Sequence, residues 1–411
     1  MTSSIPAEPQ WSCVPASGKQ INTCAITPDG SRVVCGTWVE RGDDQAVYKV
    51  YCYDASGELL WSVPVSATPI KHGVYWVAIS DDGSTVAAGG EVDYNKGFLQ
   101  AWHYVPGAPD TELLRPLLSV STPSRVNQVS LSGDGRCLLA CYGSRIALFA
   151  RSAVANGFAQ LDSFDAGANA DVQSVMVDKA GKRAVLASRT YGQNNATTGE
   201  LVSFEMGAQG FVSHKATAFD SCVMRVAITE DGSAWGASLH DGSCVCFQLS
   251  ADSAPAWRYH PELDVELAYG FGISGSDSGS VHIALGANLG PTGNPGPGVH
   301  PGGAVFSISS VGANGRYAAR CNWAIPTSFG VNPGVSLDRA GAFVTATDGK
   351  PDDSHKVDES AGHFYLFDNT AGSLLWSQKT KTMNWPMAIS ADGRAIVGGS
   401  DDGRLFYWAA G

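Results

Sequence analysis

The chain has 411 residues, of which 44% are hydrophobic and 16% are charged, and its formal net charge is −12 at pH 7. Proteins that bind nucleic acid usually carry a basic stripe that releases counterions from phosphates, so this acidic balance argues against a nucleic-acid partner. No run of about 18 apolar residues predicts a membrane span. The 48 glycines favour many tight turns over long surface helices, and we therefore expect an all-β protein.

Short apolar runs, each followed by a small turn with Asp or Gly, recur along the whole chain. Their spacing of roughly 45 to 61 residues is typical of propeller arrays. In chain order the eight runs are INTCAITPDGSRVVCGT, VYWVAISDDGSTVAAGG, VNQVSLSGDGRCLLACY, VQSVMVDKAGKRAVLAS, VMRVAITEDGSAWGASL, LAYGFGISGSDSGSVHIALG, GVSLDRAGAFVTATDG and WPMAISADGRAIVGGSDDG.

Each repeat predicts four strands. In the second repeat an apolar strand a (WVAIS) is followed by a small-residue strand b (TVAAGG), an aromatic strand c (GFLQAWHY) and an outer strand d (LLSVST). The small residues of strand b suit close packing of neighbouring sheets. We predict a closed eight-bladed β-propeller of four-stranded antiparallel blades, with seven blades as the alternative.

The two ends of the chain complement each other. The segment AEPQWSCVPASG resembles a strand d without strands a to c, whereas the last repeat, ending RLFYWAAG, lacks a strand d. We therefore expect one domain over residues 1–411, in which an N-terminal strand within residues 8–17 completes the C-terminal repeat, 384–411, and removes an open edge. The matching phrases YDASGELLW and FDNTAGSLLW predict that Trp61 and Trp376 are apolar plugs between sheets.

These phrases, D-x-x-(x)-G-x-L-L-W at residues 54–61 and 368–376, resemble the tryptophan-docking repeat of pyrroloquinoline-quinone-type β-propellers. The stretch VAISDDGSTVAAG resembles bacterial WD40-like repeats. The resemblance implies an eight-bladed propeller, and many such relatives are binding platforms without catalysis. The quinone-dependent dehydrogenases among them use a vicinal disulfide, calcium ligands and a catalytic Asp, and this sequence has no adjacent cysteine pair.

The start of the sequence, MTSSIPAEPQWS, shows no basic and apolar pattern of an export signal, so we expect a cytoplasmic protein. Its ten cysteines, mostly within apolar strands, are then expected to be thiols.

The b–c and d–a connections of a propeller emerge at one end of every blade, and the long insertions fall in the b–c connections. These insertions are residues 38–46, 90–97, 189–199, 286–303 and 347–363. The d–a connections lead into strand a with polar and aromatic residues, which predict a ligand or partner site at the channel mouth. The candidates are His72, Tyr75, Trp76, Arg125, Asn127, Arg225, Tyr269, Asn332, Asn384 and Trp385. The alternative is that these residues pack sheet against sheet, with the arginines paired to Asp171 or Glu266.

Acidic and imidazole groups gather in the 347–363 insertion. Carboxylates suit Ca²⁺ and imidazoles suit a transition metal, but the spacing matches neither an EF-hand nor an HExxH motif, and a solvated acidic loop is the alternative. The candidate ligands are Asp348, Asp352, Asp353, His355 and His363.

The sequence contains no G-x-S-x-G nucleophile motif and no phosphate-binding glycine loop. We expect a binding platform for a protein or peptide that works through the b–c and d–a connections. The alternatives are an enzyme that holds a small molecule at the channel mouth, with or without a metal, and a quinone-type oxidoreductase.

Overall fold

The computed structural model describes residues 5–39, 45–152, 156–191, 197–249, 255–275, 280–290, 302–313, 316–349 and 361–410. These ranges consist of strands, turns and loops, and no helix occurs in them, so the all-β prediction is confirmed. In the described ranges there is accordingly no helix long and apolar enough to cross a membrane.

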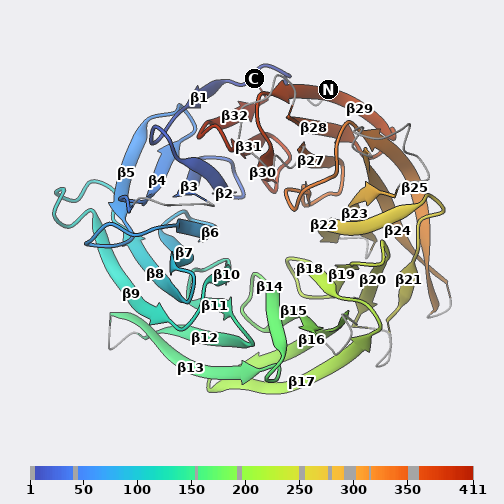
Figure 1. The fold of residues 1–411 in the computed structure, drawn as a ribbon, viewed down its shortest axis with the longest axis horizontal. Helices are drawn as coiled ribbons and strands as arrows, with labels where there is room; N and C mark the ends of the chain where they lie inside the picture. The colour runs from blue at the N-terminus through green and yellow to red at the C-terminus, as the bar shows by residue number, and fades with distance from the viewer. Residues whose placement is uncertain are drawn as a thin grey trace.

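The strands form consecutive units of four, here numbered unit 1 to unit 8 in chain order, and β1 is the fourth strand of unit 8. In Figure 1 the sheets stand around a central space, with strand a innermost and strand d at the rim, as in a propeller. Strands a are β2 (Gln20–Ile26), β6 (Gly73–Ile79), β10 (Val126–Leu131), β14 (Ala170–Val177), β18 (Val223–Ile228), β22 (Val265–Gly275), β26 (Ser336–Leu337) and β30 (Asn384–Ile389). Strands b are β3 (Arg32–Trp38), β7 (Thr85–Asp93), β11 (Cys137–Tyr142), β15 (Arg183–Tyr191), β19 (Ala234–Leu239), β23 (Val281–Leu289), β27 (Phe343–Gly349) and β31 (Ala395–Ser400).

The outer half of each sheet consists of strands c and d. Strands c are β4 (Lys49–Asp54), β8 (Lys96–Tyr104), β12 (Arg145–Ser152), β16 (Thr197–Gly207), β20 (Cys244–Gln248), β24 (Gly303–Ala313), β28 (Gly362–Asp368) and β32 (Leu405–Ala409). Strands d are β5 (Leu59–Pro64), β9 (Leu114–Thr122), β13 (Gly157–Asp165), β17 (Gly210–Phe219), β21 (Trp257–Tyr259), β25 (Arg316–Thr327), β29 (Ser373–Thr380) and β1 (Trp11–Cys13). Neighbours pair antiparallel in the order a, b, c, d, and one extra pair, Trp38 with Gly73, joins the sheets of units 1 and 2.

The recurring Asp and Gly residues build the a–b turns. A glycine with φ between 63° and 73° occupies the last turn position in seven units, a conformation that side chains with a Cβ rarely adopt. In five turns the hydroxyl at the end of strand a donates 2.6–2.7 Å to an Asp two residues on, as Ser80 does to Asp82. Units 4 and 7 carry Asp178 and Asp338 at the hydroxyl position, where the carboxylates accept backbone N–H groups directly. The acidic turn residues are thus structural.

Small residues on strand b let the next sheet approach closely. A Cβ built on Gly36 or Gly89 would lie 2.3 Å from a valine on strand a of the following unit. Large side chains fill the outer part of each interface, and Trp61 and Trp376 are buried there, as their matching phrases predict. The Trp376 indole N–H donates 3.1 Å to the carbonyl of Ile5.

The first and last units lie side by side. Strand β1 pairs with β32, with Trp11 opposite Tyr407. A Cβ on Gly399 of unit 8 would lie 2.5 Å from Ile21 of unit 1, which repeats the glycine contact between consecutive units. The Asp392 N–H also donates 3.3 Å to the Pro28 carbonyl, so the a–b turns of units 8 and 1 are bonded. Figure 1 shows the two ends of the chain meeting in this way.

The b–c connections differ from the sequence prediction in unit 2. The stretch Gly90–Gly97 was expected to be an insertion, but β7 and β8 extend through it and meet in a two-residue turn, with Asp93 opposite Lys96. The central parts of the other four insertions lie outside the described residues.

All ten cysteines are free thiols. Burial raises the pKa of Cys52, Cys137 and Cys141 to about 12, so these thiols stay protonated at neutral pH.

Candidate ligand site at the channel mouth

A cavity of about 400 Å³ occupies the central space and is lined by the innermost strand of all eight units. The residues in the wall of this cavity change from polar and aromatic to apolar along these strands. Near their starts, at the end where the b–c connections emerge (the b–c end), it carries Tyr75, Trp76, Gln128, Arg225 and Trp385. Near their ends, at the opposite a–b end, the wall is apolar and includes Ile26, Ile79, Leu131, Ile228 and Ile389. The polar part of the cavity is therefore its mouth at the b–c end.

A β-bulge near the start of strand a sets which side chains line this mouth. In units 1 to 5 the pairing with strand b skips one residue, and the residue after it lines the cavity. These equivalent residues are Thr23, Trp76, Gln128, Ser174 and Arg225. Bulges commonly redirect side chains beside functional sites, and here they place Trp76, Gln128 and Arg225 at the same level of the channel.

Arg225 is the most buried arginine of the described chain, with 7% of its surface exposed. Its Nη1 donates 3.5 Å to Gln128 Oε1 and 3.3 Å to the Gln173 carbonyl, and its Nη2 donates 3.3 Å to the Tyr269 hydroxyl. The guanidinium carbon lies 5.1 Å from the ring centre of Trp76 and 5.2 Å from that of Tyr269. Its Nε is buried and has no acceptor.

The salt bridge that the sequence offered as an alternative for Arg225 is not formed. Asp171 instead accepts from Arg189 Nη2 at 2.8 Å and from Gln173 Nε2 at 2.5 Å, and Glu266 is exposed. Burial by itself would lower the pKa of Arg225, but the hydroxyls of Tyr269 and Tyr75 raise it above its ordinary value. The guanidinium is therefore charged at any physiological pH.

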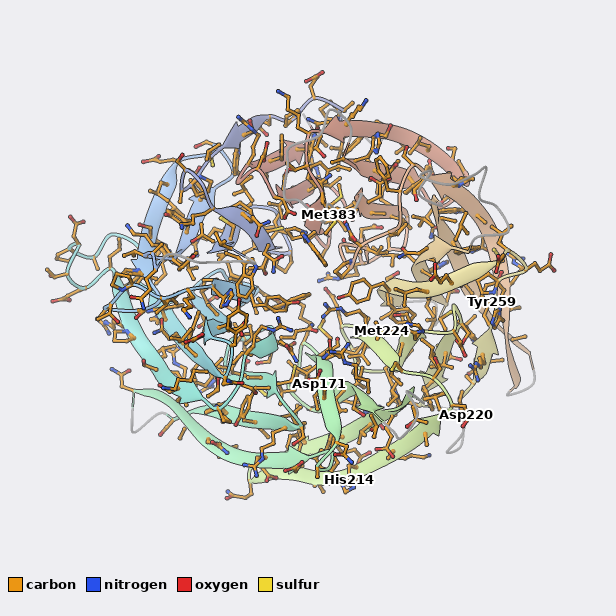
Figure 2. The ribbon with its side chains drawn as sticks, in the orientation of Figure 1. Asp171, His214, Asp220, Met224, Tyr259 and Met383 are labelled. Carbon is orange, nitrogen blue, oxygen red and sulfur yellow. The ribbon has the colours of Figure 1, made fainter. Side chains whose placement is uncertain are left out.

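Arg125 is a second cation near the mouth. Its guanidinium carbon lies 4.3 Å from the ring centre of Tyr75, and its Nε donates 3.0 Å to Asn127 Oδ1. Glu91, a buried carboxylate, lies 3.9 Å away. Figure 2 shows Met224 of unit 5 and Asp171 of unit 4 close to the central space, whereas His214 and Tyr259 lie nearer the rim.

Three predicted site residues instead join the units. The amide N–H groups of Asn127 and Asn332 donate to backbone carbonyls of the next unit, Val172 at 2.8 Å and Asn384 at 2.7 Å. Asn384 donates 2.8 Å to Thr380 Oγ1. For these asparagines the packing alternative describes the structure.

His72 is also buried, beside the cavity rather than in its wall. Its Nδ1 lies 3.1 Å from the Val39 carbonyl, its ring stacks on Trp38 at 5.3 Å, and Tyr94 of the unit 2 turn meets it edge-on at 4.8 Å. Tyr94 itself is 66% exposed and was not predicted as a site residue.

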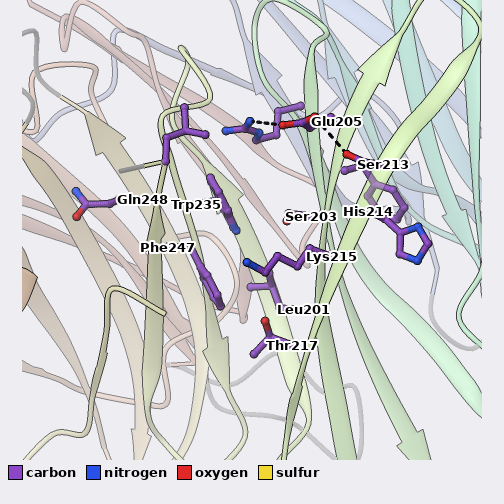
Figure 3. Close-up of a pocket in the computed structure, with 13 residues that line it drawn as sticks. Leu201, Ser203, Glu205, Ser213, His214, Lys215, Thr217, Trp235, Phe247 and Gln248 are labelled. Atoms are coloured by element: carbon purple, nitrogen blue, oxygen red, sulfur yellow. Dashed lines mark hydrogen bonds and ion pairs between the residues drawn. The ribbon is translucent and has the colours of Figure 1, made fainter. Parts of the chain in front are cut away.

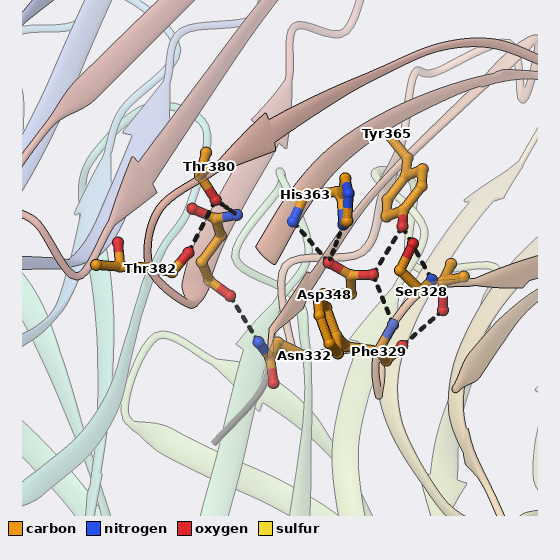
Figure 4. A network of polar contacts seen from close by, with 10 residues as sticks. Ser328, Phe329, Asn332, Asp348, His363, Tyr365, Thr380 and Thr382 are labelled. Carbon is orange, nitrogen blue, oxygen red and sulfur yellow. Dashed lines mark hydrogen bonds and ion pairs between the residues drawn. The ribbon is translucent and has the colours of Figure 1, made fainter. Parts of the chain in front are cut away.

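Asp348 and His363, two of the predicted metal ligands, belong to a buried polar network (Figure 4). Asp348 is fully buried, and its Oδ2 accepts from the Tyr365 hydroxyl at 2.7 Å and from Phe329 N–H at 2.9 Å. Its Oδ1 accepts from His363 N–H at 2.6 Å and lies 3.2 Å from His363 Nδ1. Protein donors thus surround both oxygens. Asp352, Asp353 and His355 lie outside the described residues, and the described residues hold no metal-binding group of three or more His, Cys, Asp or Glu.

A second hollow, of about 240 Å³, lies between the outer parts of units 4 and 5 (Figure 3). Trp235 and Phe247 stack at 5.9 Å in its wall, and Arg183 lies over Trp235. Unlike Arg225, Arg183 has a carboxylate neighbour, Glu205, at 3.5 Å. The arginine of this hollow is therefore paired, in contrast to Arg225 at the channel mouth.

Neither a protein-family model nor a curated protein matches this chain. The resemblance to quinone-type and WD40-like repeats accordingly stays a prediction from the repeat phrases.

Gln128, Gln173 and Ser174 are neighbours of Arg225 that were not among the predicted site residues. A usable signal was present in the sequence, because aligning the repeats on the residues after each d–a connection brings Trp76, Gln128 and Arg225 into register.

Proposed function

We propose that the chain is one closed propeller of eight blades, each unit being one blade. Three contacts between the terminal units support closure: the pairing of β1 with β32, the approach of Gly399 to Ile21, and the bond from Asp392 to Pro28. Closure leaves no open sheet edge between the last and first blades.

This propeller acts as a binding platform whose working surface is the b–c end, and its partner is a protein or peptide. The observation that carries this proposal is the charged and aromatic mouth around Arg225, which opens at the end with the long connections. At the a–b end, by contrast, the recurring turn carboxylates are engaged by their own turns. Rigid scaffolds commonly carry their binding residues on such connections. The free thiols support a cytoplasmic location.

An enzyme that holds a small molecule at the mouth is the second candidate. The cavity favours it, because about 400 Å³ falls within the size range of small-molecule sites. A quinone-type oxidoreductase ranks third, because the sequence has no adjacent cysteine pair.

Substitutions of exposed residues at the b–c end and at the a–b end test the proposed binding platform. Val47, in the unit 1 b–c connection, is 50% exposed, and Val212, beside the unit 4 c–d turn at the a–b end, is 70% exposed. Val47→Asp combined with Tyr94→Ala should abolish capture of partners from native cell extract, because both changes alter the working surface. Val212→Asp is the matched control and should capture them like the wild type. If only Val212→Asp loses the captured partners, the binding surface lies at the a–b end.

A further inference from the structure

Arg225 is deeply buried and has no Asp or Glu of the described chain within 4 Å. Six arginines of the described chain contact an Asp or Glu within 4 Å: Arg125, Arg145, Arg183, Arg189, Arg258 and Arg339. All six are more exposed than Arg225. Burial increases the cost of an unpaired charge, so among the described arginines without a carboxylate the buried Arg225 has the greatest need of a counter-ion.

The neighbours of Arg225 hold it in position without neutralising it. Its three hydrogen bonds go to uncharged acceptors and are 3.3–3.5 Å long, at the weak limit for N–H···O bonds. Trp76 and Tyr269 offer ring faces to the planar group. Its Nε has no acceptor, and Nη2 has one bond for two N–H groups, so donors on both nitrogens are unused.

Within the described part of the chain, the charged and titratable groups nearest to Arg225 do not serve as its counter-ion. Asp171 is engaged by Arg189, Gln173 and Asn127. The Cys141 thiol, which interacts with Arg225 electrostatically, is kept neutral by burial. The second cation near the mouth, Arg125, lies 3.9 Å from Glu91, so the charge of Arg125 already has a partner.

We propose that the channel mouth binds a carboxylate, which pairs with the guanidinium of Arg225 beside Trp76 and Tyr269. Nη2 has one bond for two N–H groups, so it can donate a charge-assisted hydrogen bond to such a carboxylate. The carboxylate belongs either to a small planar acid or to a peptide terminus. This assignment rests on the proposed function, since it names the ligand class of the b–c end.

The first test needs no ligand. Arg225→Met keeps the length of the side chain and removes the charge, so the melting temperature of the variant in low-salt buffer should equal or exceed that of the wild type. Arg189→Met is the matched control and should melt lower, because it leaves Asp171 without its cation. If Arg225→Met lowers the melting temperature as much as the control does, Arg225 is structural and the proposal fails.

The second test uses benzoate as the probe and benzamide as its uncharged equivalent. Benzoate at 10 mM should raise the melting temperature of the wild type by about 2 °C or more, and benzamide should not. Calorimetry should find no benzoate binding to Arg225→Met and at least about tenfold weaker binding to Arg225→Lys, which lacks the planar fork. The proposal would be overturned if benzoate raised the melting temperatures of the wild type and Arg225→Met equally. It would also be overturned if benzoate and benzamide raised that of the wild type equally.

Two further probes identify the source of the carboxylate. A short acidic peptide with a free C-terminus, compared with its amidated form, reports whether a peptide terminus binds, whereas benzoate binding without either peptide indicates a small acid. The Val47 and Tyr94 variants leave Arg225 unchanged and should keep the benzoate response. If this double variant still captures partners, the platform proposal has failed, whereas if the wild type does not bind benzoate, the carboxylate proposal has failed.

Discussion

At the scale of single residues, Arg225 and Asn127 show how the bulge in strand a can separate two polar side chains that the sequence places alike. Arg225 and Asn127 both begin inner strands, yet Arg225 follows its bulge and lines the cavity, whereas Asn127 is the skipped residue and bonds to the next unit. The sequence correctly located the polar residues at the strand starts. The sequence could not separate the residues that line the cavity from those that bond to the next unit. That difference depends on the register between strand a and strand b.

Asp348 carries a residue-scale prediction. Asp348→Asn puts an N–H₂ group among donors from Phe329, His363 and Tyr365, so at least one buried donor loses its acceptor. We expect the free energy of unfolding to fall by about 2 to 4 kcal/mol, measured by urea denaturation. The exposed Asp110→Asn is the control and should change it by less than about 0.5 kcal/mol. An unchanged stability of Asp348→Asn would show that this network is not formed.

At the scale of elements, the a–b turns explain why the fold could be predicted in such detail. The Ser or Thr, the Asp and the Gly each have a separate physical task in the turn, so all three recur and mark the end of strand a. The b–c connections carry no such constraint. The stretch Gly90–Gly97 therefore predicts a loop, although Gly90 and Gly97 also permit the close strand pairing that the structure shows.

The turns also predict how stability depends on pH. Partial burial tends to raise the pKa of Asp29, Asp82 and Asp231, but hydrogen bonds from hydroxyl and backbone N–H groups lower it below the ordinary 3.8. Such carboxylates stabilise the fold above the unfolded pKa, and their contribution disappears as pH falls through the folded values. Below about pH 4 the melting temperature should therefore drop.

Asp82→Asn isolates the contribution of one turn. The variant should be less stable than the wild type at pH 6, and the difference should shrink toward pH 3, because the wild-type carboxyl is then losing its charge. Thermal melts at both values give the comparison. A difference that grows toward pH 3 would contradict the role assigned to these turns.

At the scale of the whole molecule, the proposed closure of the ring predicts that the N-terminal segment stabilises the protein. Deleting residues 1–17 removes β1, the Ile5 carbonyl that accepts from Trp376, and the Trp11 ring that stacks on Tyr407 at 5.1 Å. We expect one cooperative transition shifted down by about 5 °C or more in calorimetry. Deleting only residues 1–4 is the control, since these contacts involve Ile5 and later residues. If both deletions melt like the full chain, the ring does not depend on this strand.

The innermost strands of all eight units line one cavity, so Arg225 meets residues that are distant in sequence. A crystal structure of the full chain soaked with benzoate tests this account most directly. It should show the carboxylate paired with the guanidinium of Arg225, beside Trp76 and Tyr269, at the b–c end of a closed ring. A structure in which saturating benzoate leaves this mouth empty, or in which Arg225 pairs with a carboxylate of its own chain, would contradict it.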